Sequence, residues 1–308
     1  MAKTLNRKET LKYLKQQADK NALFLENQPE TFLDETLDGE MVLSKNLLLL
    51  VDKLETENGK IKNTKKNLLL ITELDAIFTN FRNGAGLAIV TSLIKNLNTV
   101  VSNSFKYYSL FLGGDKLGST KKNIVSLVND RYGINPDGTM KKDQFVYSLL
   151  NDKSVQNETR EIFYTSVIGA ATIPELRKTV DEFANGKKEK EKITRGAIYK
   201  FYSRFTGDVF SETDRMSSLI FANEFGLDTF LYYGIIENNS RPFCIKNINK
   251  LFTIKEAEKW PFQNPKPLGI DATYNPVINM GGKNCKHLAM FLNKELVDEY
   301  KKGGFVYG

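Results

Sequence analysis

Three side chains that could bind a metal, or act as a nucleophile and a base, lie in one stretch near the end of the chain. The 308 residues include two cysteines, Cys244 and Cys285, and a single histidine, His287. Thiolate sulfur and imidazole nitrogen are ligands that zinc prefers, and a structural zinc site needs four ligands. The fourth would be a carboxylate such as Asp271, or a water. Zinc is therefore a possible cofactor, bound by Cys244, Cys285 and His287.

The same residues allow two other kinds of chemistry. Cys244 or Cys285 as nucleophile with His287 as base would make a cysteine enzyme. Cys285 and His287 are two residues apart, so on a strand they would share a face without reaching attack geometry. A disulfide between the cysteines would close a loop of about 40 residues and stabilise the fold by about 4 kcal/mol. A reducing compartment opposes such a bond during assembly.

The interpretation that the sequence favours is structural. Two buried thiols and a hydrogen-bonded histidine would fasten a loop, and we predict no catalytic residue in the chain. The residues that we expect to form this clasp are Arg241, Cys244, Asn284, Cys285 and His287. The loop that it would hold, residues 261–282, has no periodicity, and a loop of that length is typical of a functional or docking segment. We expect a partner to bind there.

The elements around the loop are predicted from local patterns. Residues 243–245 and 251–253 read as two strands of a hairpin. Thr253 with Glu256 forms a capping box that opens a short helix. Residues 227–236 are apolar and aromatic, which predicts a buried strand.

The preceding chain is predicted to be mostly helical. Residues 1–27 form an amphipathic pattern, an acidic connector surrounds Pro29, and a second helix starts near Met41. A later helix is expected to end at the Asn83-Gly84 pair. A segment with near-heptad apolar spacing follows over residues 87–108, and such stripes are typical of a core or a helix seam.

Helix-capping patterns predict further boundaries. Thr172 and Glu175 form a capping box with Pro174 between them. One helix is predicted over residues 193–205, and Ser211-Glu212-Thr213-Asp214 is predicted to cap another that stops at Gly226.

Two glycine-containing segments do not fit the ligand-binding motifs that they suggest. Residues 113–119 match neither a P-loop nor a dinucleotide fingerprint, so a flexible loop is expected. Residues 133–144 lack carboxylates at both ends of a calcium loop, so a turn is expected.

Composition limits the class of protein. Forty-four lysines and arginines against 37 aspartates and glutamates give a formal net charge of +7, which leaves nonspecific DNA contact open. The first residues are polar and lack the apolar core of a signal peptide. The most apolar runs, near residues 47–51 and 86–94, are shorter than the roughly 20 residues of a membrane span. We expect a soluble protein without membrane contact, made in a reducing compartment.

These patterns predict an α+β fold. A mostly helical N-terminal region is expected at residues 1–170, as a scaffold for assembly. A helical domain with a small β-hairpin or sheet is expected at residues 171–308.

The order of features from about Thr172 to Met290 resembles the phage Mu F-like head-morphogenesis family, the minor head proteins of tailed bacteriophages. Arg241-Pro242-Phe243-Cys244 is similar to that family's Arg-x-x-His segment, with cysteine in place of histidine. Gly281-Gly282-Lys283-Asn284-Cys285-Lys286-His287 is similar to the segment that ends in the family's Asn-Cys-Arg-Cys or Asn-Cys-Arg-His, with lysine in place of arginine. The resemblance covers the C-terminal part of the chain only.

The resemblance implies a structural role rather than an enzymatic one. It predicts a component of a tailed-bacteriophage virion, acting in capsid assembly as a minor head, neck or head-to-tail connector protein. Its partners would be portal, neck or tail proteins and copies of itself, and it would be made in the host bacterial cytoplasm. The alternatives are a zinc- or cysteine-dependent enzyme carried on the virion, and a nonspecific DNA-binding accessory protein.

Overall fold

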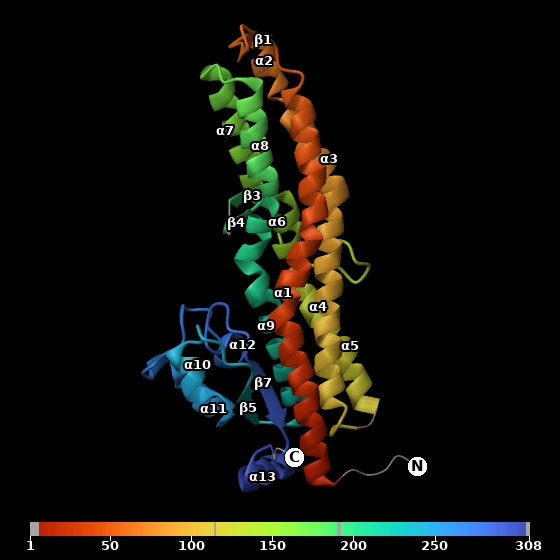
Figure 1. Ribbon diagram of the computed structural model, residues 1–308. Helices are drawn as coiled ribbons and strands as arrows, with labels where there is room; N and C mark the ends of the chain where they lie inside the picture. Colours follow the sequence, from red (N-terminus) through yellow and green to blue (C-terminus); the bar gives the residue numbers. More distant parts are fainter. Residues whose placement is uncertain (1–5, 114, 190–191, 306–308) are drawn as a thin grey trace. The chain divides into compact units, whose positions relative to one another are not determined.

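The computed structural model of the protein describes residues 6–113, 115–189 and 192–305. Helices make up 67% of the chain. The strands of the described residues form antiparallel sheets of two or three strands (Figure 1). The predicted α+β class is therefore confirmed.

The helices of the described residues range from the 45-residue α1 to single turns. In chain order they are α1 (Arg7–Val51), α2 (Lys65–Leu70), α3 (Glu73–Phe81), the π-helical turn η1 (Arg82–Gly86), α4 (Leu87–Tyr108), α5 (Asp115–Tyr132), α6 (Phe145–Asn151), α7 (Ser154–Ile168), α8 (Ile173–Asn185), α9 (Ala197–Phe225), α10 (Pro242–Asn247), α11 (Ile254–Ala257), the 3-10 turn η2 (Trp260–Phe262), α12 (Pro276–Asn279) and α13 (Lys294–Gly303). The strands are β1 (Thr56–Glu57), β2 (Lys60–Ile61), β3 (Gly186–Glu189), β4 (Lys192–Arg195), β5 (Thr229–Tyr233), β6 (Leu251–Thr253) and β7 (Leu288–Leu292).

The chain forms two compact units, and each unit draws on separate stretches of sequence. One contains residues 1–29, 95–131 and 205–308, and the other contains residues 30–94 and 132–204. These units do not follow the predicted division at residue 170. The difference arises because α1, α4 and α9 each continue through a unit boundary, and a boundary inside a helix leaves no linker composition for the sequence to show.

The predicted connector around Pro29 is wrong, because α1 continues through it. Proline donates no backbone hydrogen bond, so one bond of the helix ladder is missing at Pro29. The buried stripe nevertheless continues at helical spacing on both sides of the proline. Its fully buried members include Leu14, Leu25, Phe32, Leu43 and Leu47. Burial of this stripe outweighs the local cost of the proline.

The chain also stays helical at Asn83-Gly84, where an end was predicted. These residues lie in η1, and Leu87 then begins α4. Asn83 and Gly84 therefore lie in a π-helical turn and do not end the helix. Such turns occur singly within longer helices.

By length and composition alone, the helical stretch Lys65–Tyr108 is long and apolar enough to cross a membrane. No such stretch was expected from the sequence, because the apolar runs at residues 47–51 and 86–94 are short. An 18-residue window within Lys65–Tyr108 has a mean hydropathy of 1.3, and 39% of that window is buried. Leu93, Leu97 and Val100 of α4 are buried, as they would be in a core helix of a soluble protein.

Of the two predictions for glycine-containing segments, one is partly wrong and the other is confirmed. The loop predicted at residues 113–119 is wrong from residue 115 onward, where α5 begins; residue 114 lies outside the described residues. The turn predicted at residues 133–144 is confirmed, because Ile134 pairs with Met140 across it and Gly138 has a φ of 84°.

Capping patterns predicted one boundary correctly and another incorrectly. The capping box of Thr172 and Glu175 opens α8. Ser211-Glu212-Thr213-Asp214 opens no helix, because it lies inside the 29-residue α9. The hydroxyl of Thr213 instead donates 2.6 Å to the carbonyl oxygen of Val209, one turn earlier, an arrangement that threonine adopts within helices.

The C-terminal sheet has the strand order β6-β5-β7. The buried strand predicted at residues 227–236 is confirmed as β5, the central strand, in which Phe230 pairs with Phe252 on one side and Phe291 on the other. The predicted strand at residues 243–245 is wrong, because these residues lie in α10. Pro242 is at the first position of this helix, where proline's fixed φ favours helix initiation.

An aromatic cluster packs beside this sheet. Trp260 is fully buried, and its ring lies 5.2 to 5.9 Å from four others. These rings belong to Phe230, Tyr232, Phe243 and Phe252. The Thr253–Glu256 capping box is confirmed and starts α11 just before this tryptophan. The cluster thereby ties α10 and η2 to β5 and β6.

Candidate metal centre

The structure brings both cysteines and the histidine together. Cys244 comes from α10, while Cys285 and His287 lie in the segment that leads into β7. Their ligand atoms all lie within 4.8 Å of one another. All three residues are buried, and both cysteines are free thiols.

Cys285 and His287 lie close together just before β7. Cys285 Sγ lies 3.6 Å from His287 Nδ1. The two residues do not lie on a strand, because residues 285–287 precede β7 and the backbone turns at Asn284, whose φ is 58°. A thiol and an imidazole at this separation can exchange a proton as well as share a metal.

Tyr232 completes the group, and the sequence analysis missed it. The Tyr232 hydroxyl donates to Cys244 Sγ at 3.2 Å and lies 3.6 Å from Cys285 Sγ. It lies in β5 opposite Ala289 of β7. Its place in an aromatic run (Phe230, Tyr232, Tyr233) indicated only a buried strand, so no local signal distinguished its hydroxyl.

Gly281 forms the wall of the group on one side. A Cβ atom at this position would lie 2.6 Å from Cys244 Sγ, 3.0 Å from Cys285 Sγ and 3.1 Å from Tyr232 Oη. Carbon atoms do not approach sulfur and oxygen so closely. Only glycine leaves this face of the two sulfur atoms and the phenol oxygen clear.

The two thiols have opposite electrostatic environments. The hydrogen bond from Cys244 lowers the pKa of Cys285 well below its usual value, and His287 and Arg215 lower it further. The hydrogen bond to Cys285, together with burial, raises the pKa of Cys244. The two thiols therefore titrate as one pair, in which the pKa of Cys285 is lowered and the pKa of Cys244 is raised.

Arg215 of α9 holds the segment that carries Cys285 and His287. Its side chain is fully buried. Nη1 donates to the carbonyl oxygens of Cys285 at 2.6 Å and His287 at 2.9 Å, and Nε donates to the carbonyl oxygen of Ile278. The guanidinium of Arg215 therefore binds backbone carbonyl groups of the C-terminal segment.

Arg241 connects the start of α10 to the same segment. Nη1 donates to the carbonyl oxygen of Gly281 at 3.2 Å, and Nη2 donates to that of Lys283. Four predicted clasp residues, Arg241, Cys244, Cys285 and His287, therefore surround one point of the structure.

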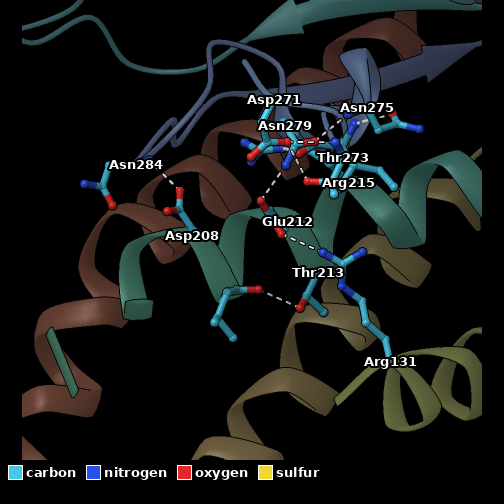
Figure 2. A network of polar contacts seen from close by, with 12 residues as sticks. Arg131, Asp208, Glu212, Thr213, Arg215, Asp271, Thr273, Asn275, Asn279 and Asn284 are labelled. Carbon is cyan, nitrogen blue, oxygen red and sulfur yellow. Dashed lines mark hydrogen bonds and ion pairs between the residues drawn. The ribbon is translucent and has the colours of Figure 1, made fainter. Parts of the chain in front are cut away.

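The fifth predicted clasp residue, Asn284, contributes through its backbone. Its N–H donates to the carboxylate of Asp208 in α9 (Figure 2). One turn further along α9, Glu212 accepts from Asn279 Nδ2 at 2.6 Å and from Arg131 Nη2 at 2.7 Å. Figure 2 shows Asp208, Glu212 and Arg215 directed at the loop from successive positions on this helix.

Asp271 does not supply the fourth metal ligand that was predicted. Its Oδ1 accepts from the backbone N–H of Thr273 at 2.8 Å and from the Thr273 hydroxyl at 2.7 Å. These local bonds lower the pKa of Asp271 and close a turn. Among the described residues, the cluster of potential metal ligands contains only the two cysteines and the histidine.

The cysteines and the histidine line a cleft of about 320 Å³. Glu26, Glu237 and Lys286 line the same cleft. Desolvation raises the pKa of Glu26, and a hydrogen bond with Glu237 raises it further. Lys286 Nζ lies 3.6 Å from Glu237. The cleft therefore combines sulfur, imidazole and carboxyl groups.

Compared with models of protein families, with curated proteins and with solved structures, the chain matches none. The resemblance to the Mu F-like family stays a prediction from the residues themselves.

Proposed function

We propose that the protein is a structural component of a tailed-bacteriophage virion, in the head, the neck or the head-to-tail connector. The observation that supports this proposal best is the contact of Arg241 with the carbonyl oxygens of Gly281 and Lys283. It joins the two short segments on which the resemblance to minor head proteins depends. Two segments some 40 residues apart in the sequence are thereby joined by polar contacts, as a clasp requires.

The loop that this unit holds exposes apolar side chains. Phe262 is 89% exposed and Leu268 is 52% exposed. Large aromatic residues on a fixed loop are typical anchors of protein interfaces. A loop held at α9 by Glu212 and Arg215 would present Phe262 to a neighbouring virion protein with little loss of conformational entropy on binding.

The proposal is tested on particles from cultures that produce the protein. Mass spectrometry of purified particles should detect the chain, and a cryo-electron microscopy map should place it near the portal. Particles made with Phe262→Ala should carry several-fold fewer copies, because the anchor is lost. Ile168→Ala is the matched control, since Ile168 is also an exposed apolar residue, at 64%, and lies outside the loop. Purified particles without the chain would overturn the proposal.

A second function is favoured by one observation. Cys285 Sγ and His287 Nδ1 lie 3.6 Å apart and line the cleft with Glu26 and Glu237, which supports a cysteine- or zinc-dependent enzyme as the alternative. Iodoacetamide would then modify Cys285 faster than an ordinary thiol, because a lowered pKa increases the thiolate fraction. Slow modification, at the rate of a buried neutral thiol, would contradict this alternative.

A further inference from the structure

We infer that the protein binds one zinc ion through Cys244 Sγ, Cys285 Sγ and His287 Nδ1, with the Tyr232 hydroxyl oxygen in the fourth position. The inference goes beyond the proposed virion role and does not depend on it.

The spacing of the donor atoms fits this metal. With Zn–S near 2.3 Å and Zn–N or Zn–O near 2.0 Å, neighbouring donors of a tetrahedral site lie about 3.5 Å apart. Three separations in the structure are close to that value: 3.6 Å from Cys285 Sγ to His287 Nδ1, and 3.2 and 3.6 Å from Tyr232 Oη to the two sulfur atoms. The cysteine and histidine donors lie within 4.8 Å of one another, so a small contraction would complete the tetrahedron.

The imidazole gives an independent indication. His287 is only 7% exposed, and its Nε2 has no hydrogen-bond partner among the described residues. Within the same residues, Nδ1 has one polar contact, with the sulfur of Cys285, which is a weak acceptor. A buried imidazole usually has strong partners on both nitrogens. A metal ion at Nδ1 would supply a strong partner for one of the two ring nitrogens.

The surroundings favour an ion held by two thiolates. Zn²⁺ with two thiolates carries no net charge, which suits a buried position. Arg215 fixes the carbonyl groups of Cys285 and His287 and so orients both ligands. Gly281 keeps the face of the donors clear.

The fourth ligand makes the site a closed one. Tyr232 is fully buried in β5, so its hydroxyl approaches the sulfur atoms from the sheet and not from the cleft. A closed four-ligand site is typical of structural zinc. The ion would cross-link α10, β5 and the segment before β7 without a disulfide, which a reducing compartment would not sustain.

The full chain, expressed in zinc-containing medium, tests the inference by elemental analysis. We expect about one zinc per chain, and at least about a tenfold loss of affinity in Cys285→Ser. Asp271→Asn is the matched control, because Asp271 is an acidic residue of the same loop whose side chain accepts from Thr273 and lies outside the cluster of potential metal ligands. Its zinc content should equal that of the wild type. Less than one zinc in ten chains of the wild type would overturn the inference, as would a Cys244–Cys285 disulfide found by mass spectrometry.

Cobalt titration of the wild-type protein avoids dependence on variants that fail to fold. After removal of zinc by a chelator, Co²⁺ bound by two thiolates should give a thiolate charge-transfer band in the near ultraviolet and tetrahedral bands in the visible. Saturation should occur at about one ion per chain. A spectrum without the charge-transfer band would contradict ligation by the cysteines.

Tyr232→Phe tests the fourth ligand separately. It keeps the ring and removes the hydroxyl, so zinc affinity should fall by roughly tenfold while the cysteine and histidine ligands remain. Unchanged affinity would overturn the four-ligand site.

Discussion

Arg215 Nη1 donates a hydrogen bond of 2.6 Å to the carbonyl oxygen of Cys285, so a side chain of the long helix α9 fixes the segment that carries two of the three candidate metal ligands. The arginine is fully buried and also serves the carbonyl oxygens of Ile278 and His287. This contact connects the helical scaffold to the chemistry of the C-terminal unit.

Replacement of Arg215 by methionine should destabilise the protein strongly. The substitution keeps an unbranched apolar stem but leaves the carbonyl oxygens of Ile278, Cys285 and His287 without this donor, so we expect a loss of about 3 to 5 kcal/mol in the free energy of unfolding. Urea denaturation measures this value. Arg7→Ala, which removes an exposed ion pair with Glu295, should cost less than about 1 kcal/mol. Equal losses would show that the contacts of Arg215 contribute no more than a surface pair.

Two glycine substitutions should have opposite effects. Gly281→Ala places a Cβ 2.6 Å from Cys244 Sγ, so the thiol group must move and the protein should lose about 1 to 3 kcal/mol. Gly118 lies in α5, and among the described residues a Cβ there would meet no atom within 4 Å apart from its chain neighbours and the backbone of its own helix. Gly118→Ala should add about 0.5 to 1 kcal/mol, because alanine favours a helix more than glycine does. Thermal unfolding of both variants compares them directly, and a neutral Gly281→Ala would contradict the close packing of the site.

Asp214 should make stability depend on pH in an unusual direction. It is wholly buried, and desolvation raises its pKa above 3.8, although Ser104 and Asn21 each donate to it at 2.7 Å. The folded protein thus holds the Asp214 proton more tightly than the unfolded chain does. The corresponding stability is complete below pH 3.8 and is lost as the pH rises through the raised pKa.

The Asp214→Asn variant isolates this contribution. The difference in unfolding free energy between wild type and variant, measured by denaturant titration from pH 3 to 8, should move against the wild type as the pH rises. Asp137→Asn should show the opposite trend, because hydrogen bonds from Thr139 lower the pKa of Asp137. A pH-independent difference for Asp214 would contradict the prediction.

Replacement of Pro29 should stabilise α1. Proline inside a helix costs about 3 kcal/mol relative to alanine and glycine costs about 1, so Pro29→Ala should raise the unfolding free energy by up to about 3 kcal/mol and Pro29→Gly by about 1 kcal/mol less. Chemical denaturation of the two variants provides the comparison. Loss of stability in Pro29→Ala would mean that the helix does not continue through this position.

The sequence predicted the features that depend on residues a few positions apart. The capping boxes at Thr172 and Thr253 and the buried strand at Thr229–Tyr233 are of this kind. A cap needs only a side-chain oxygen and the backbone N–H groups of the next turn, and a buried strand shows its apolar character directly. The helical and α+β character of the chain followed from the same local patterns.

The predicted interruptions of the long helices are wrong, because the same local residues can either end a helix or lie inside one. Pro29 and Ser211-Glu212-Thr213-Asp214 both resemble helix boundaries, yet α1 and α9 continue through them. Buried neighbours such as Phe32, or Phe210 beside Ser211, decide the matter, since tertiary packing supplies most of the stability of a helix.

The candidate site shows the same limit. The rarity of Cys244, Cys285 and His287 was enough to mark one region of the sequence. Only the tertiary structure brought the hydroxyl of Tyr232, the bare backbone of Gly281 and the guanidinium of Arg215 to the same point. Side chains of β5, α9 and α10 meet the segment before β7 at this point. They do so because β5 pairs with β7 and because Arg215 fixes the segment before β7. Such long-range contacts depend on the packing of the whole unit, so the residues that neighbour each of these side chains in sequence do not predict them.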